Sequence, residues 1–131
     1  MTRIAQLFDG SDSSGFPDFS SRQIVEDDSE RARIKQFLTG GTLILRTSGR
    51  GADVLAPEKK RAVPMSYATD GVWIWSRAAA YYLSNHGIAP EEDFLEHIRR
   101  CDYSAIVPDQ DTVSSAIDRL KQHFASTQNQ S

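Results

Sequence analysis

The sequence predicts an α+β fold: a small antiparallel sheet with a central β-hairpin, covered by three to four helices. The first observation is the pair Asp70-Gly71, which is a preferred two-residue turn of β-hairpins. The second is a set of segments on both sides of this pair whose apolar residues recur at helical spacing. These segments do not alternate regularly with strands, so the pattern does not predict a doubly wound parallel sheet.

Length and composition predict one domain over residues 1–131. The formal net charge is −3, whereas a general nucleic-acid binder needs a clustered basic surface. Cys101 is the one cysteine, so no disulfide can form within the chain. Because the sequence has no apolar run long enough to span a bilayer and no recognisable secretory signal, we expect a cytoplasmic protein that does not bind membranes.

Both ends of the chain are predicted to be loosely structured. Residues 1–19 form a flexible arm, in which Ile4 and the apolar residues after it make at most one turn or a short strand. The rest of the arm is rich in Asp, Ser and Gly, which is typical of a surface loop. A second interpretation is an acidic arm that contacts a basic partner. The polar tail, about 126–131, is predicted to be disordered.

A helix, a strand and a basic loop are predicted before the hairpin. Residues 20–38 have helical spacing, with Ser29 as a candidate N-cap, and Gly40-Gly41 ends the helix. Residues 42–47 (TLILRT) have the composition of a strand. The basic loop 46–61 follows and includes the turn SGRGAD, after which a short return strand is possible.

The hairpin is predicted to span Val63 to Trp75. With a two-residue turn, the predicted pairs are Thr69 with Val72, Ala68 with Trp73, Tyr67 with Ile74, and Ser66 with Trp75. Alternation then separates a face with Met65, Tyr67, Val72 and Ile74 from a face with Ser66, Ala68, Trp73 and Trp75. The first face is large enough to form one buried surface. The indoles on the second face must therefore be covered separately, either by helices or by a partner.

Three further helices and a short strand are predicted after the hairpin. Ser76 is positioned to cap a helix that ends before Gly87. Pro90 opens the next helix, whose acidic start and basic end suit the helix dipole. A short strand is predicted over 103–107. Asp111 or Thr112 then opens the last helix, with an apolar side formed by Val113, Ile117, Leu120 and Phe124.

The sequence predicts no metal, cofactor or catalytic residue. His86, His97 and His123 lie on separate predicted helices and not at the spacing of a ligand pair. Cys101 lies four residues after His97, so contact is conceivable, but no orienting Asn or oxyanion site is recognisable. The turn SGRGAD lacks the ending of a phosphate-binding loop. Its glycines and the basic residues around it nevertheless suit an anion. A nucleotide-binding or enzymatic module that uses the loop 46–61 is therefore an alternative.

The segment TDGVWIWSRAAAYYLSNHGIAPEEDFLEHI, Thr69 to Ile98, carries a resemblance. It resembles short, mostly uncharacterised bacterial proteins that share Thr-Asp-Gly, Trp-x-Trp, Tyr-Tyr-Leu, His-Gly, Pro and a closing Phe…His-Ile. Such proteins are similar to immunity proteins of polymorphic toxin systems, which neutralise a secreted toxin domain. The match covers about a quarter of the chain, and its residues are mostly of the types that form turns, caps and cores. The resemblance therefore implies no catalytic residue.

The leading hypothesis is a non-enzymatic protein-binding domain, most plausibly an immunity-type inhibitor that occludes a cognate bacterial toxin. Aromatic side chains are typical interface anchors, and acidic side chains suit a basic toxin domain. The candidate contacts are Trp73, Trp75, Tyr81, Tyr82, Asp9, Asp12, Asp18, Asp27 and Asp28. For the aromatic residues the alternative is core packing. A third hypothesis is a structural or oligomerisation domain whose hairpin pairs with a second copy.

Overall fold

A computed structural model describes residues 3–5, 24–46, 50–51, 58, 62–64 and 66–128. Its helices are α1 (Asp28–Gly40), α2 (Ala78–His86), α3 (Glu92–Arg100) and α4 (Gln110–Gln128). Its strands are β1 (Arg3–Ile4), β2 (Thr42–Leu45), β3 (Arg50–Gly51), β4 (Val63–Pro64), β5 (Tyr67–Thr69) and β6 (Trp73–Ser76). The predicted α+β class is confirmed.

The main sheet is mixed, with strand order β1-β6-β5-β2. The strands β5 and β6 form the antiparallel hairpin, and β2 pairs antiparallel with β5. The strand β1 pairs parallel with β6, so the prediction of a purely antiparallel sheet is wrong. A parallel neighbour needs a long connection, and β1 has one because α1, β2 and the hairpin's first strand come before β6. The strands β3 and β4 form a separate two-stranded sheet.

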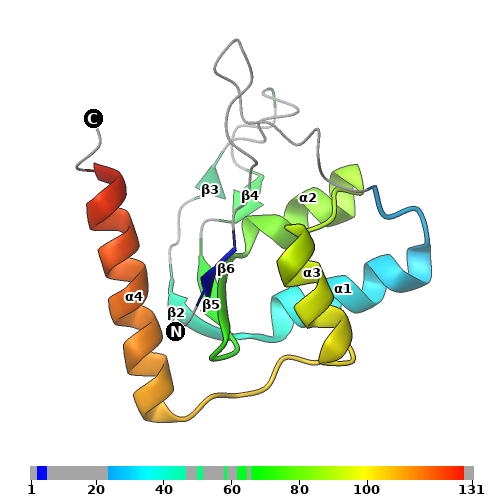
Figure 1. Cartoon of the computed structure of the whole chain (residues 1–131). Coiled ribbons are helices and arrows are strands. Elements are labelled where there is room, and N and C mark those ends of the chain that lie inside the picture. The colour runs from blue at the N-terminus through cyan, green and yellow to red at the C-terminus, as the bar shows by residue number, and fades with distance from the viewer. Residues whose placement is uncertain are drawn as a thin grey trace.

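The molecule has three layers, with the main sheet in the middle (Figure 1). The helices α1, α2 and α3 lie on one side of the sheet, and α4 lies on the other. One core joins Trp73 and Trp75 to apolar residues of α1, α2 and α3. A second core joins Ile74 to Ala116 and Leu120 of α4. Successive residues of β6 therefore point into different cores, as the two-residue period of a strand requires.

The hairpin register differs from the prediction by two residues. The observed pairs are Thr69 with Ile74, Ala68 with Trp75, and Tyr67 with Ser76. A shift by one residue exchanges the two faces of a strand, but a shift by two preserves them. The predicted division of Tyr67 and Ile74 from Ala68 and Trp75 is therefore correct, although each predicted pair is wrong.

Side chains of the hairpin loop explain the longer turn. The Thr69 hydroxyl donates to the Trp73 carbonyl at 2.7 Å and accepts from the Gly71 N–H at 3.0 Å. One carboxylate oxygen of Asp70 accepts the N–H groups of Val72 and Trp73 at 3.0 and 2.9 Å. Asp and Thr often hydrogen-bond to nearby backbone in this way. Val72 consequently lies in the loop and is exposed rather than buried.

The N-terminal region contains a short strand and a helix. The strand β1 includes Ile4, where the sequence allows a short strand, and hydrogen bonds from the Arg3 N–H to the Val72 carbonyl and from the Ala5 N–H to the Ile74 carbonyl hold it beside the hairpin. The helix α1 begins at Asp28, with Asp27 rather than Ser29 as its cap. Residues 24–27 precede it without helical structure, and Ile24 forms a β-bridge with Ile88.

The C-terminal region corrects two further expectations. The predicted strand over 103–107 is absent, and these described residues form an irregular linker between α3 and α4. Asp102 and Tyr103 have φ of 53° and 61°, which turns the chain away from an extended path. The last helix begins at Gln110 after an Asp109 cap, and it runs to Gln128, into the predicted disordered tail.

Candidate functional site

The two tryptophans predicted as partner contacts lie in the core. Trp73 is 3% exposed and Trp75 is 0% exposed. Both rings contact Phe94 of α3, with ring centroids 5.1 and 5.3 Å apart. The alternative role, core packing, therefore describes both residues, because a buried ring offers a partner no surface in the folded chain.

The tyrosines of α2 divide between core and surface. Tyr82 is buried in a small cluster with Val63, Ala78 and Ile88. Tyr81 is half-buried and packs edge-on against the Tyr82 ring at 5.4 Å. Of the four aromatic candidates, Tyr81 thus retains a partly accessible surface.

The acidic candidates are accessible where the structure describes them. Asp27 and Asp28 are exposed at the start of α1, where Asp27 also accepts the Ser29 N–H at 2.9 Å. Acidic side chains suit the N-terminus of a helix, so a local structural role accounts for both positions. Asp9, Asp12 and Asp18 lie outside the described residues.

The structure bears differently on the two alternative hypotheses, nucleotide binding and self-pairing of the hairpin. The basic loop 46–61 lies mostly outside the described residues, so the nucleotide-binding alternative stays a prediction. The hairpin has neighbours on both sides, because β6 pairs with β1 and β5 pairs with β2. Pairing of the hairpin with a second copy therefore needs β1 or β2 to be displaced.

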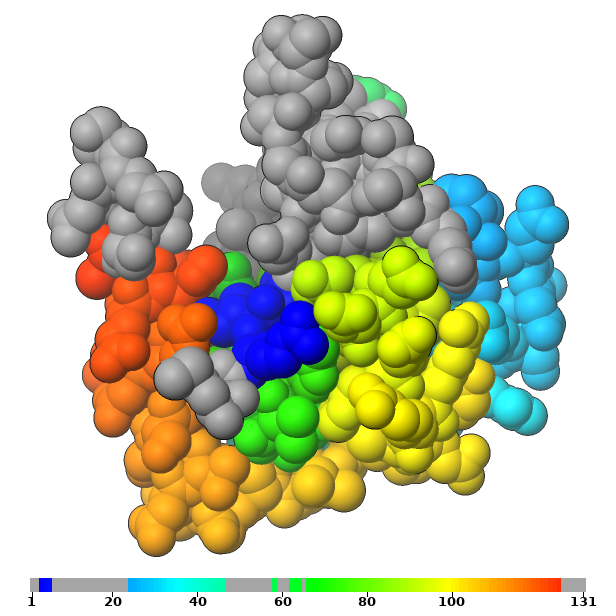
Figure 2. Space-filling model, viewed as in Figure 1, coloured from blue at the N-terminus to red at the C-terminus, as the bar shows by residue number. Residues whose placement is uncertain are grey.

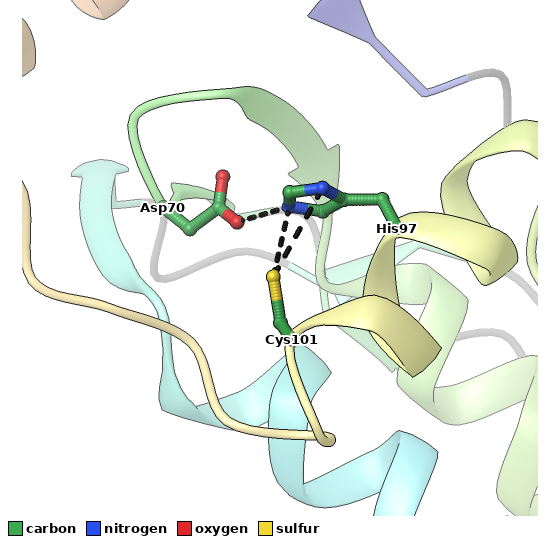
Figure 3. A group of neighbouring side chains, drawn as sticks. All are labelled: Asp70, His97 and Cys101. Carbon is green, nitrogen blue, oxygen red and sulfur yellow. Dashed lines mark hydrogen bonds and ion pairs between the residues drawn. The ribbon is translucent and has the colours of Figure 1, made fainter.

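Three side chains that can bind metals or take part in catalysis converge between the hairpin loop and the end of α3 (Figure 3). Asp70 comes from the loop, while His97 and Cys101 come from the last turn of α3 and its cap. The Asp70 carboxylate lies 2.6 Å from Nε2 of His97. The Cys101 sulfur lies 3.6 Å from the same nitrogen and 4.0 Å from Nδ1.

Neighbouring groups hold this cluster in place. Asp70 is 1% exposed, and its second oxygen is occupied by the two N–H groups of the hairpin loop. The His97 ring lies edge-on against Phe37 and tilted against Trp73. The pair of Asp70 and His97 consequently ties the hairpin loop to α3, with charge assistance when the imidazole is protonated.

The arrangement does not form a catalytic relay from carboxylate through imidazole to thiol. Such a relay places the carboxylate and the nucleophile on opposite ring nitrogens, whereas Asp70 and Cys101 both approach Nε2 most closely. Burial raises the pKa of the Cys101 thiol above its ordinary value, and the Asp70 charge raises it further, against a smaller opposing effect of Arg100. A protonated thiol is a weak nucleophile.

Sequence reasoning noted the spacing of His97 and Cys101 but missed Asp70. The four-residue spacing is a local signal, since such residues share a helix face. Asp70 is 27 residues before His97, and nothing in the turn motif indicates that its carboxylate points toward α3. The contact depends on how the hairpin packs against that helix.

Apart from this cluster, one part of the surface combines exposed aliphatic and acidic side chains. We call it the linker surface; it comprises the exposed residues Val72, Asp102, Ile106, Val107, Asp109 and Asp111. Val107 is 82% exposed, Ile106 is 61% exposed and Val72 is 46% exposed. The hairpin loop lies against the end of the linker, since a Cβ on Gly71 would be 3.1 Å from the Pro108 side chain. Figure 2 shows this linker along the lower edge of the molecule, between α3 and α4.

The chain matches no protein-family model, no curated protein and no solved structure. The resemblance to immunity proteins therefore stays a prediction. Among the helices that the structure describes, none combines the length and the apolar composition needed to cross a membrane.

Proposed function

We propose that this chain is a cytoplasmic protein-binding domain of the immunity type, which occludes a basic toxin domain with its linker surface. The observation that carries the proposal is the exposure of Ile106 and Val107 beside carboxylates of the same linker. The resemblance of Thr69–Ile98 to immunity proteins supports the same class. The contact surface differs from the tryptophan face suggested by the sequence.

The composition of the linker surface supports protein binding. Isolated exposed aliphatic residues are common on monomers, but here two adjacent ones project from an irregular segment, with a third in the neighbouring loop. Interfaces typically surround an apolar centre with a polar rim. Asp102 and Asp109 are exposed in the same linker and Asp111 in the first turn of α4, and these carboxylates supply such a rim. Burial of each aliphatic side chain stabilises a complex by about 1.5–3 kcal/mol.

The charge of the chain favours a basic partner. Its net charge is −3, and complementary charge accelerates association. Toxin domains that act on nucleic acids or nucleotides carry basic surfaces, because they bind phosphates. An acidic surface that covers such a site excludes its substrate without any catalysis by the inhibitor.

The test is protection of bacteria from the toxin-like product of a neighbouring gene. Cells that express this product are expected to survive when the chain is co-expressed, and the two proteins are expected to co-purify. Ile106→Asp combined with Val107→Asp is expected to weaken the complex about tenfold or more, because a buried carboxylate replaces each apolar contact. Gln122→Asp combined with Ala125→Asp, at two exposed positions of α4, is the matched charge control, because it also adds two negative charges.

Three results would contradict the proposal at different levels. Failure of the wild-type chain to bind the neighbouring product would reject the immunity assignment. Equal binding by the double variant and the wild-type chain would reject the linker surface. Equal loss with the double control variant of Gln122 and Ala125 would show a general charge effect. Circular dichroism of each variant establishes that the fold is retained.

A further inference from the structure

Asp70, His97 and Cys101 offer one carboxylate oxygen, one imidazole nitrogen and one sulfur, all within 4.8 Å of one another. Zn²⁺ is bound in proteins by these three ligand types. Ca²⁺ and Mg²⁺ take oxygen ligands instead, so the donor set selects a transition metal of the zinc class. We propose that these three residues form a metal site for Zn²⁺ or a similar ion.

The distance between the Cys101 sulfur and Nε2 of His97 is close to that of a tetrahedral site. Zn–N and Zn–S bonds of about 2.0 and 2.3 Å put the two ligand atoms about 3.5 Å apart at a tetrahedral angle. The Cys101 sulfur lies 3.6 Å from Nε2 of His97. Because the sulfur is also 4.0 Å from Nδ1, it does not lie along the Nε2 lone pair, so metal binding requires the Cys101 side chain to rotate.

The proton shared by Asp70 and His97 lies between the two ligand atoms that the metal would join. Their atoms are 2.6 Å apart, shorter than the separation of about 3.4 Å expected for oxygen and nitrogen ligands of one tetrahedral ion. Metal entry therefore replaces the shared proton and moves the two atoms apart. The shared proton and the thiol proton both pass to water, since the ligands bind in their deprotonated forms.

The surroundings meet the other requirements of a metal site. The outer oxygen of Asp70 is held by the N–H groups of Val72 and Trp73, and such contacts orient ligands and strengthen binding. Asp70 is buried, whereas His97 and Cys101 are partly exposed. Ions therefore have access from the side of Cys101, and three protein ligands leave a fourth position for water.

The metal would connect the hairpin loop to the end of α3, next to the linker that begins at Asp102. The proposal does not rest on the immunity-type function, because none of its three residues belongs to the linker surface. A chain that binds metal and no toxin, or toxin and no metal, separates the two proposals.

Titration of the chelator-treated chain with Co²⁺ tests the site. Co²⁺ takes the place of Zn²⁺ in such sites, and a bound thiolate gives a ligand-to-metal charge-transfer band in the near ultraviolet. The expected result is this band, saturating at one Co²⁺ per chain and reversed by Zn²⁺. Cys101→Ser is expected to abolish the band, and His97→Gln to weaken Co²⁺ binding by at least about tenfold. His123→Gln, on the exposed side of α4, is the matched histidine control and should bind normally.

The proposal is overturned if the folded wild-type chain gives no thiolate band with Co²⁺, or if the band persists in Cys101→Ser. It is also overturned if His123→Gln weakens binding as much as His97→Gln, because the ion then binds at surface histidines. Since loss of the pair with Asp70 can destabilise His97→Gln, circular dichroism accompanies each titration. Cys101→Ser alters no hydrogen bond between Asp70 and His97, so it provides the test independent of folding.

Discussion

At the scale of single residues, Trp75 has the most closely defined surroundings. Its indole N–H donates to the Leu38 carbonyl at 2.9 Å, which satisfies the polar atom that burial would otherwise leave unpaired. Its ring contacts Phe37 and Phe94 at centroid distances of 5.2 and 5.3 Å. Gly41 allows this close approach, because a Cβ there would lie 2.5 Å from the indole.

The first prediction concerns the adjacent glycines at the end of α1. Gly41→Ala is expected to destabilise the chain by about 1–3 kcal/mol, because the new methyl group collides with a ring enclosed by other rings. Gly40→Ala is the matched control, since a Cβ there has open space, and alanine favours a helix over glycine by up to about 1 kcal/mol. Urea unfolding measures both. Equal effects of the two substitutions would contradict the close contact with Trp75.

The second prediction concerns the burial of both indoles. Trp73 and Trp75 are 3% and 0% exposed, so the folded chain should emit at short wavelength and resist quenching by acrylamide. Unfolding in urea should shift the emission to longer wavelength and restore quenching. Strong quenching of the native chain would place an indole at the surface. The face with Trp73 and Trp75 would then again be a candidate interface.

At the scale of secondary structure, hydrogen bonds from outside the helix fix its end, from a distant segment in α1 and from a neighbouring residue in α4. The last carbonyls of a helix lack partners within it. In α1, the Leu38 carbonyl accepts from Trp75 and the Thr39 carbonyl accepts from Arg77 at 3.0 Å. The end of α1 is thereby joined to the end of β6. In α4, Asp109 accepts the Thr112 N–H at 2.8 Å and forms the N-cap.

The third prediction is a pH dependence that arises from the α4 cap. Hydrogen bonds from the Thr112 side chain and then from its backbone N–H lower the pKa of Asp109 from its ordinary 3.8. A lowered folded-state pKa stabilises the fold above pH 3.8, and this contribution disappears as the pH falls through the folded value. Asp109→Ala should therefore lower the urea midpoint at pH 7, and its difference from wild type should shrink as the pH falls below 3.8.

The control for this pH dependence is Asp118→Ala, at an exposed position in the middle of α4. It removes the same charge from the same helix without removing a cap. A difference from wild type that shrinks equally for both variants would attribute the effect to net charge rather than to the cap.

At the scale of the whole molecule, one sheet separates two cores. The indoles of β6 lie with α1, α2 and α3, whereas Ile74 between them lies with α4. Because both cores use the same short strand, loss of either should disrupt the other. A small domain of this kind is expected to unfold in one transition.

The fourth prediction tests this coupling with Leu120→Ala. Leu120 is buried against Ile74, and loss of a buried leucine side chain destabilises a fold by about 2–5 kcal/mol. The urea midpoint measured by tryptophan fluorescence should fall as far as the midpoint measured by helicity, although both indoles lie on the other face. Lys121→Ala, at an exposed neighbouring position, should change neither. A lower midpoint for helicity alone would show that α4 unfolds separately.

The location of most elements was predictable from the sequence because it depends on local signals. Gly87 ends α2 with φ of 71°, as predicted for a glycine cap, whereas the N-cap is Arg77 rather than the predicted Ser76. The alternation of faces in β6 was also correct. The candidate contacts were less predictable, because burial of an aromatic residue depends on which helices cover the strand.

The sequence by itself determined the α+β class, the hairpin around Asp70-Gly71 and the apolar faces of helices and strands, since propensity and periodicity act between neighbours along the chain. Only the tertiary structure decided the parallel pairing of β1, the hairpin register, the burial of Trp73 and Trp75, and the meeting of Asp70 with His97. These features depend on packing between segments distant in sequence. In particular, alternation does not decide the hairpin register, because a strand shifted by two residues presents the same faces.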